Sequence, residues 1–255
     1  MGKIKIFKDV SWQLWEDIVR KSSYSTYFHT PFWARLIVET FPKFSIATIG
    51  IERADGSVAI LPLIEERKGL FGKKRQLKSM EPGVYGGIVA EGELSSEEIE
   101  KVFYYLTTLG RQSIRIVDNP FNPFSLPPIY RKRALSTHIL DLSLGIEHIW
   151  HSFGRGQKSN IRQAQKKGIV VRQALHIDDI EHYYDIYNRA VKDWDLPKGK
   201  LYPKKLFINL LNNQDKGIKI WLAEKEKTII AGIVVLYWNK KMFFWHGCFR
   251  RDYSK

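Results

Sequence analysis

Hydrophobic residues recur along this chain with helical and strand spacing, and glycines and prolines separate the resulting segments. The first half is predicted to hold, in order, helices over 11–21 and 32–40, strands over 44–51, 57–66, 75–80 and 88–90, a helix over 95–109 and a strand over 113–117. The second half is predicted to hold a strand over 136–142, a helix over 146–153, a basic helix that Gly168 ends, a strand over 169–173, helices over 179–194 and 203–212, and strands over 217–224, 228–238 and 241–249.

The two halves therefore share a plan of two helices, a hairpin and a further strand, which predicts an α+β (mixed α/β) fold. We expect two tandem domains, each with a mostly antiparallel central sheet flanked by helices. Residues 1–118 form the first domain, residues 119–134 a connection rich in proline and aromatics, and residues 135–255 the second domain.

The second domain has no counterpart of the helix and strand over 95–117. The strand over 241–249, with Phe243, Phe244 and Trp245, is then expected to be an uncovered aromatic surface. We interpret the second domain as C-terminally incomplete, without its final helix and strand. A partner chain that covers the 241–249 strand is the alternative.

The charge of the chain restricts its partners. The 41 Lys and Arg residues exceed the 27 Asp and Glu residues, for a formal net charge of +14. Such an excess favours nucleic acid, nucleotide-linked substrates or an anionic membrane surface, although solubility alone also explains it. The single cysteine, Cys248, permits no disulfide within the chain and fits a reducing compartment. No segment is typical of a signal peptide or a bilayer span, so we expect a cytoplasmic protein without stable membrane insertion.

The basic helix places Lys158, Arg162 and Lys166 on one narrow arc, with Ile161 and Ala164 on another that faces a core. Three cations along one side repel one another, and a bound anion would offset that cost. These side chains are therefore phosphate-binding candidates, with Arg162 foremost because guanidinium pairs bidentately with phosphate oxygens. A solvated helix face is the alternative.

Several of these segments resemble the Fem family, the peptidoglycan bridge-forming aminoacyltransferases within the GNAT acyltransferase superfamily. Asn-Ile-Arg-Gln-Ala-Gln-Lys-Lys-Gly-Ile at 160–169 is similar to the family signature R-x-x-I-x-x-A-x-K-x-G-V, and the hairpin over 220–232 also resembles the family. Tyr-Phe-His-Thr-Pro-Phe-Trp at 27–33 is similar to the tP-x-W start of the first domain, Tyr85-Gly86-Gly87 to the glycine loop, and 114–120 to the l-R-i-e-P strand end. The resemblance covers nearly the whole chain, but the family normally continues beyond the residues that match 250–255.

The resemblance implies two tandem GNAT-like domains and acyl transfer to an amine without a covalent enzyme intermediate. The donor would be aminoacyl-tRNA or acyl-CoA, with no permanently bound cofactor, and the acceptor would be a phosphorylated amine such as a cell-wall precursor. An acyl-CoA-dependent GNAT acetyltransferase is one alternative. A non-catalytic relative that binds RNA or a phosphosugar is another.

Two residues are candidates for general acid–base catalysis. Asp118 follows a strand, where ligands gather in α/β folds, and can orient or deprotonate an amine; a turn cap is its alternative role. His246, between Trp245 and Gly247, can be a base or an acceptor contact, or simply a half-buried residue.

Further candidates for substrate binding lie in the first domain. Arg35 can supply a cation, although a surface role explains it equally, and Tyr85 with Gly86 and Gly87 can present backbone N–H groups to an anion or form an ordinary tight turn. The histidines show no metal-ligand spacing, so no metal is expected.

Overall fold

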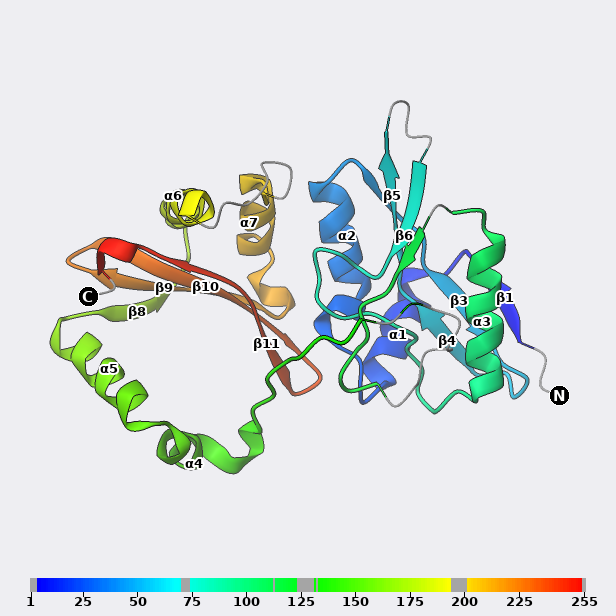
Figure 1. The fold of residues 1–255 in the computed structure, drawn as a ribbon, viewed down its shortest axis with the longest axis horizontal. Coiled ribbons are helices and arrows are strands. Elements are labelled where there is room, and N and C mark those ends of the chain that lie inside the picture. The colour runs from blue at the N-terminus through cyan, green and yellow to red at the C-terminus, as the bar shows by residue number, and fades with distance from the viewer. Residues whose placement is uncertain are drawn as a thin grey trace. The chain divides into compact units, whose positions relative to one another are not determined.

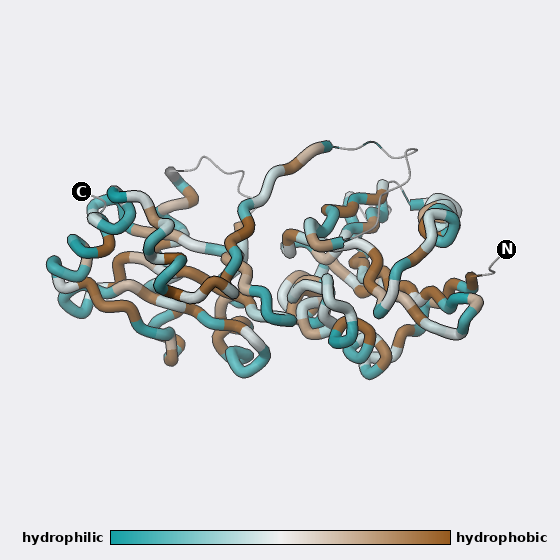
Figure 2. The backbone as a smooth tube through the Cα atoms, turned by 90° about the horizontal axis from the view of Figure 1, so that it is seen from below, coloured by the Kyte–Doolittle hydropathy of each residue, from teal (hydrophilic) through white to brown (hydrophobic). Residues whose placement is uncertain are grey.

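The computed structural model describes residues 4–69, 74–111, 113–122, 131, 133–193 and 201–253. The chain forms two compact units. The first consists of Met1–Lys132, Asn212–Ile218 and Leu236–Trp245, and the second of Arg133–Leu211, Lys219–Val235 and His246–Lys255. Hydrophobic residues gather in the interior of each unit, and hydrophilic residues occupy many of its turns (Figure 2). The predicted mixed α+β class is confirmed, whereas the boundaries of the two tandem domains stay a prediction.

Two small sheets form the first unit. Their strands are β1 (Lys5–Phe7), β2 (Phe44–Ile46), β3 (Ile49–Glu52), β4 (Val58–Leu61), β5 (Ile64–Lys68), β6 (Lys74–Lys78) and β7 (Ser113–Arg115). One sheet has the order β1-β3-β4 and is antiparallel. The other has the order β2-β5-β6-β7, and only its β6–β7 pair is parallel.

The predicted strands over 44–51 and 57–66 each divide into two, because the chain passes from one sheet to the other within them. The two crossings lie opposite each other: the N–H of Ala47 donates to the Leu63 carbonyl at 2.9 Å, and the N–H of Leu63 donates to Thr48 Oγ1 at 3.2 Å. Pro62 at the second crossing has no N–H to give to a ladder. Side-chain and loop bonds thus replace ladder bonds where the strands change sheet.

Three helices cover these sheets: α1 (Trp12–Lys21), α2 (Pro31–Thr40) and α3 (Ser96–Thr108) (Figure 1). The side chains of Ser11, Thr30 and Ser95 cap their N-termini. Helix α3 packs Val102, Phe103 and Leu106 into a core that also holds Ile51, Leu61 and Leu77.

The second half of the chain forms α4 (Gly145–Ser152), α5 (Arg155–Lys166), β8 (Val170–Gln173), α6 (Ile177–Asp193), α7 (Lys204–Leu211), β9 (Ile218–Lys225), β10 (Thr228–Trp238) and β11 (Lys241–Phe249). The sheet order is β11-β10-β9-β8. Helices α6 and α7 lie over one face of this sheet (Figure 1), where Tyr183 and Phe207 are fully buried. The strand predicted over 136–142 does not form: these residues pair with no described strand, and Leu135 and Ile139 beside and within it are exposed.

The end of the β10–β11 hairpin belongs to the first unit. The Asn239 side-chain amide donates to the carbonyls of Val19 (3.1 Å) and Ser22 (2.9 Å) and to Ser25 Oγ (2.8 Å), and the Trp238 indole donates to the same hydroxyl at 2.9 Å. These bonds attach the hairpin end to the C-terminal end of α1.

The aromatic strand β11 is less exposed than the sequence suggests. Phe243 is buried against Phe28, with ring centroids 5.6 Å apart, and Trp245 packs on Trp33 at 5.4 Å. Of the three aromatic residues expected on an uncovered surface, Phe244 alone is exposed.

Candidate functional site

Helix α5 carries the predicted cationic stripe. Lys158, Arg162 and Lys166 line a hollow of about 330 Å³ together with Arg155, Ser159 and Gln163. The helix ends as the sequence predicts. Gly168 has a φ of 72°, the N–H of Ile169 donates to the Ala164 carbonyl at 3.1 Å, and the N–H of Gly168 donates to the Gln165 carbonyl at 3.0 Å. The structure therefore brings the three predicted cations together on one helix face.

The cations of this stripe have no carboxylate partner among the residues that the structure describes. Lys158 Nζ donates to the His151 carbonyl at 3.0 Å, and the Arg162 guanidinium lies 6.0 Å from the centre of the Trp150 ring. Arg172, in contrast, is held by carboxylates of Asp179 and Glu224, each at 2.7 Å. The stripe is thus left with uncompensated positive charge, whereas Arg172 is committed to a structural ion pair.

The prediction that Ile161 and Ala164 face a core is wrong for Ile161. Ile161 is 36% exposed, Ala164 is half-buried, and no residue of α5 is buried. Helical periodicity fixed which residues share a face, but it does not determine whether a neighbouring element covers that face.

The glycine loop after β6 is built by close backbone contact. The N–H of Gly86 donates to the Val117 carbonyl at 2.7 Å, and the N–H of Val117 donates to Ser79 Oγ at 2.9 Å. A Cβ atom on Gly86 would lie 2.1 Å from Ser79 Cβ, so only glycine fits there. The Gly86 N–H is therefore bonded within the loop, a contact that matches the tight-turn alternative for Gly86.

Aromatic residues hold this loop in place. The Trp33 indole donates to the Met80 carbonyl at 2.9 Å, and the Trp245 indole donates to the Pro82 carbonyl at 3.2 Å. Tyr85 is half-buried, with its ring 6.1 Å from that of Phe28. The Thr-Pro-Phe-Trp segment at 30–33 therefore caps α2, begins it with proline, and supplies the tryptophan that fastens the loop.

Asp118 is exposed and follows β7, as predicted. Its Oδ1 accepts the N–H of Asn119 at 3.0 Å, which is the turn-capping role that the sequence also allowed. The buried Asn119 donates to the Tyr24 carbonyl at 2.8 Å. A Cβ atom on Gly87 would lie 3.8 Å from Asp118 Oδ1, so this carboxylate borders the glycine loop.

His29, in the short turn just before α2, is fully buried, and the sequence did not identify it as a site residue. Its Nδ1 accepts the N–H of Thr26 at 3.0 Å, and burial lowers the pKa of His29 to about 4. The ring is therefore neutral at neutral pH and serves the packing of this region.

Arg35 occupies an exposed position on α2. Its guanidinium lies 4.8 Å from the centre of the Trp12 ring, a cation–π contact on the surface of the first unit. This contact matches the surface role that was the alternative to substrate binding.

His246 lies in an aromatic cluster that the sequence did not reveal. Its Nδ1 is 2.5 Å from the Tyr183 hydroxyl, and the rings of Tyr187, Phe207 and Tyr202 surround it at 4.9, 5.1 and 5.8 Å. Burial lowers the pKa of His246 to about 4. The imidazole is therefore a neutral and weakly basic group at neutral pH, and its surroundings match the alternative of a buried histidine.

Cys248 is a core residue of the second half of the chain. It is buried, and burial raises the pKa of its thiol to about 12. No group of three or more His, Cys, Asp or Glu side chains in the described ranges is arranged to hold a metal ion.

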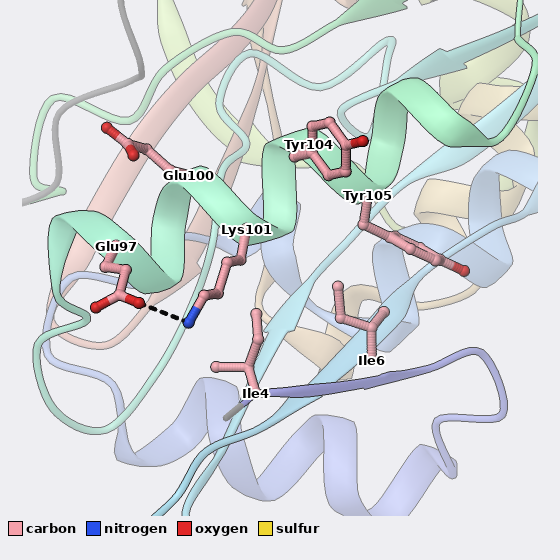
Figure 3. Close-up of a pocket in the computed structure, with 7 residues that line it drawn as sticks. All are labelled: Ile4, Ile6, Glu97, Glu100, Lys101, Tyr104 and Tyr105. Carbon is pink, nitrogen blue, oxygen red and sulfur yellow. Dashed lines mark ion pairs between the residues drawn. The ribbon is translucent and has the colours of Figure 1, made fainter. Parts of the chain in front are cut away.

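A larger hollow, of about 580 Å³, lies between β1 and α3 (Figure 3). Ile4, Ile6 and Tyr105 form its apolar part, while Glu97 pairs with Lys101 at 2.7 Å and Glu100 adds a further carboxylate. None of the predicted site residues lines this hollow, and its carboxylates disfavour a phosphorylated ligand.

Comparisons with known proteins establish the fold and not the family. No protein-family model and no curated protein matches this sequence. The crystal structure of FemX superposes with a TM-score of 0.65 over 98% of this chain and 81% of FemX, at 11% identity. A conserved protein of unknown function from Bacteroides thetaiotaomicron VPI-5482 gives a TM-score of 0.49 over 90% of this chain and 74% of its own, at 13% identity. Within the described residues, no helix has both the length and the hydropathy to cross a bilayer. The chain has a Fem-like fold.

Proposed function

We propose that this protein is a Fem-type N-acyltransferase that transfers an aminoacyl group from aminoacyl-tRNA to the amine of a phosphorylated acceptor. The FemX-like fold over 98% of the chain supports a transferase of this type. The observation that carries the donor assignment is the cationic stripe of α5, which has no carboxylate partner among the described residues.

The spacing of the stripe favours a nucleic-acid donor over acyl-CoA. Lys158, Arg162 and Lys166 are four residues apart, so successive cations stand about 6 Å apart along the helix axis. A row of cations at this interval follows the repeating phosphates of a strand. The two phosphates of a pyrophosphate are adjacent and would engage one or two of these side chains.

The transfer itself requires an amine that loses a proton as it attacks. The amine nitrogen forms a bond to the ester carbonyl carbon of the donor, the ester C–O bond breaks, and the tRNA hydroxyl leaves with a proton. We assign the orientation or deprotonation of the amine to Asp118, because its exposed carboxylate borders the glycine loop. His246 is the weaker candidate, since the aromatic cluster buries it.

The salt dependence of tRNA binding tests the role of α5. The variant Lys158→Gln/Arg162→Gln/Lys166→Gln is compared with Lys8→Gln/Lys227→Gln/Lys240→Gln, which removes three exposed cations elsewhere. We expect the α5 variant to lower the slope of log K against log [salt] by about 2 to 3, and the control to leave the slope nearly unchanged. Equal slopes in the two variants would show that the stripe is a solvated helix face.

Transfer assays separate the alternatives. Labelled aminoacyl-tRNA and an amine-bearing acceptor should give a new amide in the presence of the wild-type protein. Transfer from acetyl-CoA, with no effect of tRNA, would favour the acetyltransferase. Binding of tRNA with no transfer to any acceptor would favour a non-catalytic RNA-binding relative.

A further inference from the structure

The hairpin formed by β5 and β6 opposes like charges at its end. Its register places Arg67 opposite Arg75 and Lys68 opposite Lys74, and all four side chains are exposed. Like charges directly opposite each other in an antiparallel pair are destabilising. We refer to these four residues as the cationic hairpin end.

Nearby carboxylates do not neutralise the cationic hairpin end. Lys68 lies 3.3 Å from Glu66, but Glu66 is shared with Lys43 at 2.8 Å and Lys78 at 2.6 Å. Arg75 lies 3.6 Å from Glu65, which also pairs with Arg111. Arg67 and Lys74 have no acidic partner within the ranges that the structure describes.

The cations occupy both faces of the hairpin, because successive side chains of a strand point to opposite faces. Arg67 and Arg75 share one face, and Lys68 and Lys74 share the other. The β5–β6 hairpin projects beyond the neighbouring elements of the first unit (Figure 1). A projecting element with cations on both faces suits a broad anionic plane, whereas a single strand of phosphates would be followed by cations on one face.

We propose that the cationic hairpin end binds an anionic lipid surface, reversibly and without a membrane-spanning segment. This contact is separate from the cationic stripe of α5 and does not depend on the proposed transferase activity. Its strength falls with ionic strength, because exposed charges are screened.

Vesicle sedimentation tests the proposal. The wild-type protein is mixed with phosphatidylcholine vesicles and with vesicles that also contain about 40 mol% phosphatidylglycerol, at about 0.1 M NaCl. We expect binding to the anionic vesicles only. Each neutralised cation weakens partitioning about five-fold, so Lys68→Gln/Lys74→Gln should bind about 25-fold more weakly.

Two further variants identify the binding surface. Lys8→Gln/Lys227→Gln removes the same charge from exposed positions elsewhere and should bind within about two-fold of wild type. The α5 variant Lys158→Gln/Arg162→Gln/Lys166→Gln should also retain most of its vesicle binding. Thermal unfolding followed by circular dichroism should show that Lys68→Gln/Lys74→Gln remains folded, because the substitution removes a like-charge pair.

Three outcomes would overturn the proposal. One is equal binding to neutral and anionic vesicles, or none to either. The second is equal loss in Lys68→Gln/Lys74→Gln and its control, or loss in the α5 variant instead. The third is a Lys68→Gln/Lys74→Gln protein that keeps vesicle binding but binds tRNA more weakly, which would assign the hairpin end to nucleic acid.

Discussion

Replacement of Asn239 measures how firmly the β10–β11 hairpin end is attached to α1. The Asn239 amide contacts the carbonyls of Val19 and Ser22 and the hydroxyl of Ser25 at 2.8–3.1 Å. An NH₂ group has two hydrogens for these three acceptors, so at most two full hydrogen bonds contribute to the free energy of unfolding. At about 1 kcal/mol each, their loss costs about 2 kcal/mol.

The backbone of Asn239 contributes separately. Its φ is 44°, in the left-handed region that asparagine tolerates better than alanine. Alanine there adds about 1 kcal/mol of strain, whereas glycine adds almost none. We therefore expect Asn239→Ala to lower the free energy of unfolding by about 3 kcal/mol and Asn239→Gly by about 2 kcal/mol.

Urea unfolding followed by tryptophan fluorescence gives both values. Trp238, one of the eight tryptophans, lies beside the substituted residue and bonds to the same Ser25 hydroxyl. The reasoning fails if Asn239→Ala changes the free energy of unfolding by less than about 0.5 kcal/mol, the range of ordinary surface substitutions. It also fails if the glycine variant is less stable than the alanine variant.

Three other measurements test separate parts of the structure. Asp118→Asn keeps an oxygen for the Asn119 N–H and should leave unfolding unchanged while lowering aminoacyl transfer about 100-fold, and an unaffected rate would remove Asp118 from the mechanism. Gly86→Ala should destabilise by about 2 kcal/mol or more because its Cβ would overlap Ser79, whereas Gly92→Ala, with open space around it, should change stability by less than about 0.5 kcal/mol. The pKa values of His29 and His246 are lowered by burial from 6.5 to about 4, so below about pH 6.5 the unfolded chain binds protons that the folded chain does not. The free energy of unfolding should therefore fall by about 2 kcal/mol between about pH 7 and about pH 5.5, and a constant value over this window in urea titrations would contradict the burial of both rings.

Local signals in the sequence predicted the features that depend on neighbouring residues. The end of α5 at Gly168 forms as predicted. Like the caps at Ser11, Thr30 and Ser95, it requires only residues a few positions apart. The shared face of Lys158, Arg162 and Lys166 follows from helical spacing in the same way.

Features that depend on distant residues were not predictable. The partner of His246 is Tyr183, which lies 63 positions earlier in the chain, and no local pattern connects them. The N–H of Gly86 is taken by Val117, a contact that sequence spacing does not indicate. The strand predicted over 136–142 is absent for the same reason. Strand-like alternation of hydrophobic and polar residues does not form a strand where no described strand pairs with the segment.

The composition of the first unit has a practical consequence for dividing the protein. Residues 212–218 and 236–245 are part of that unit, and they supply Trp245 and Asn239 to its loop and helix contacts. A fragment that stops at residue 132 would leave Trp33 and Phe28 without the rings that cover them. Expression of such a fragment should yield an aggregation-prone product, and co-expression with the remaining residues should restore solubility by complementation.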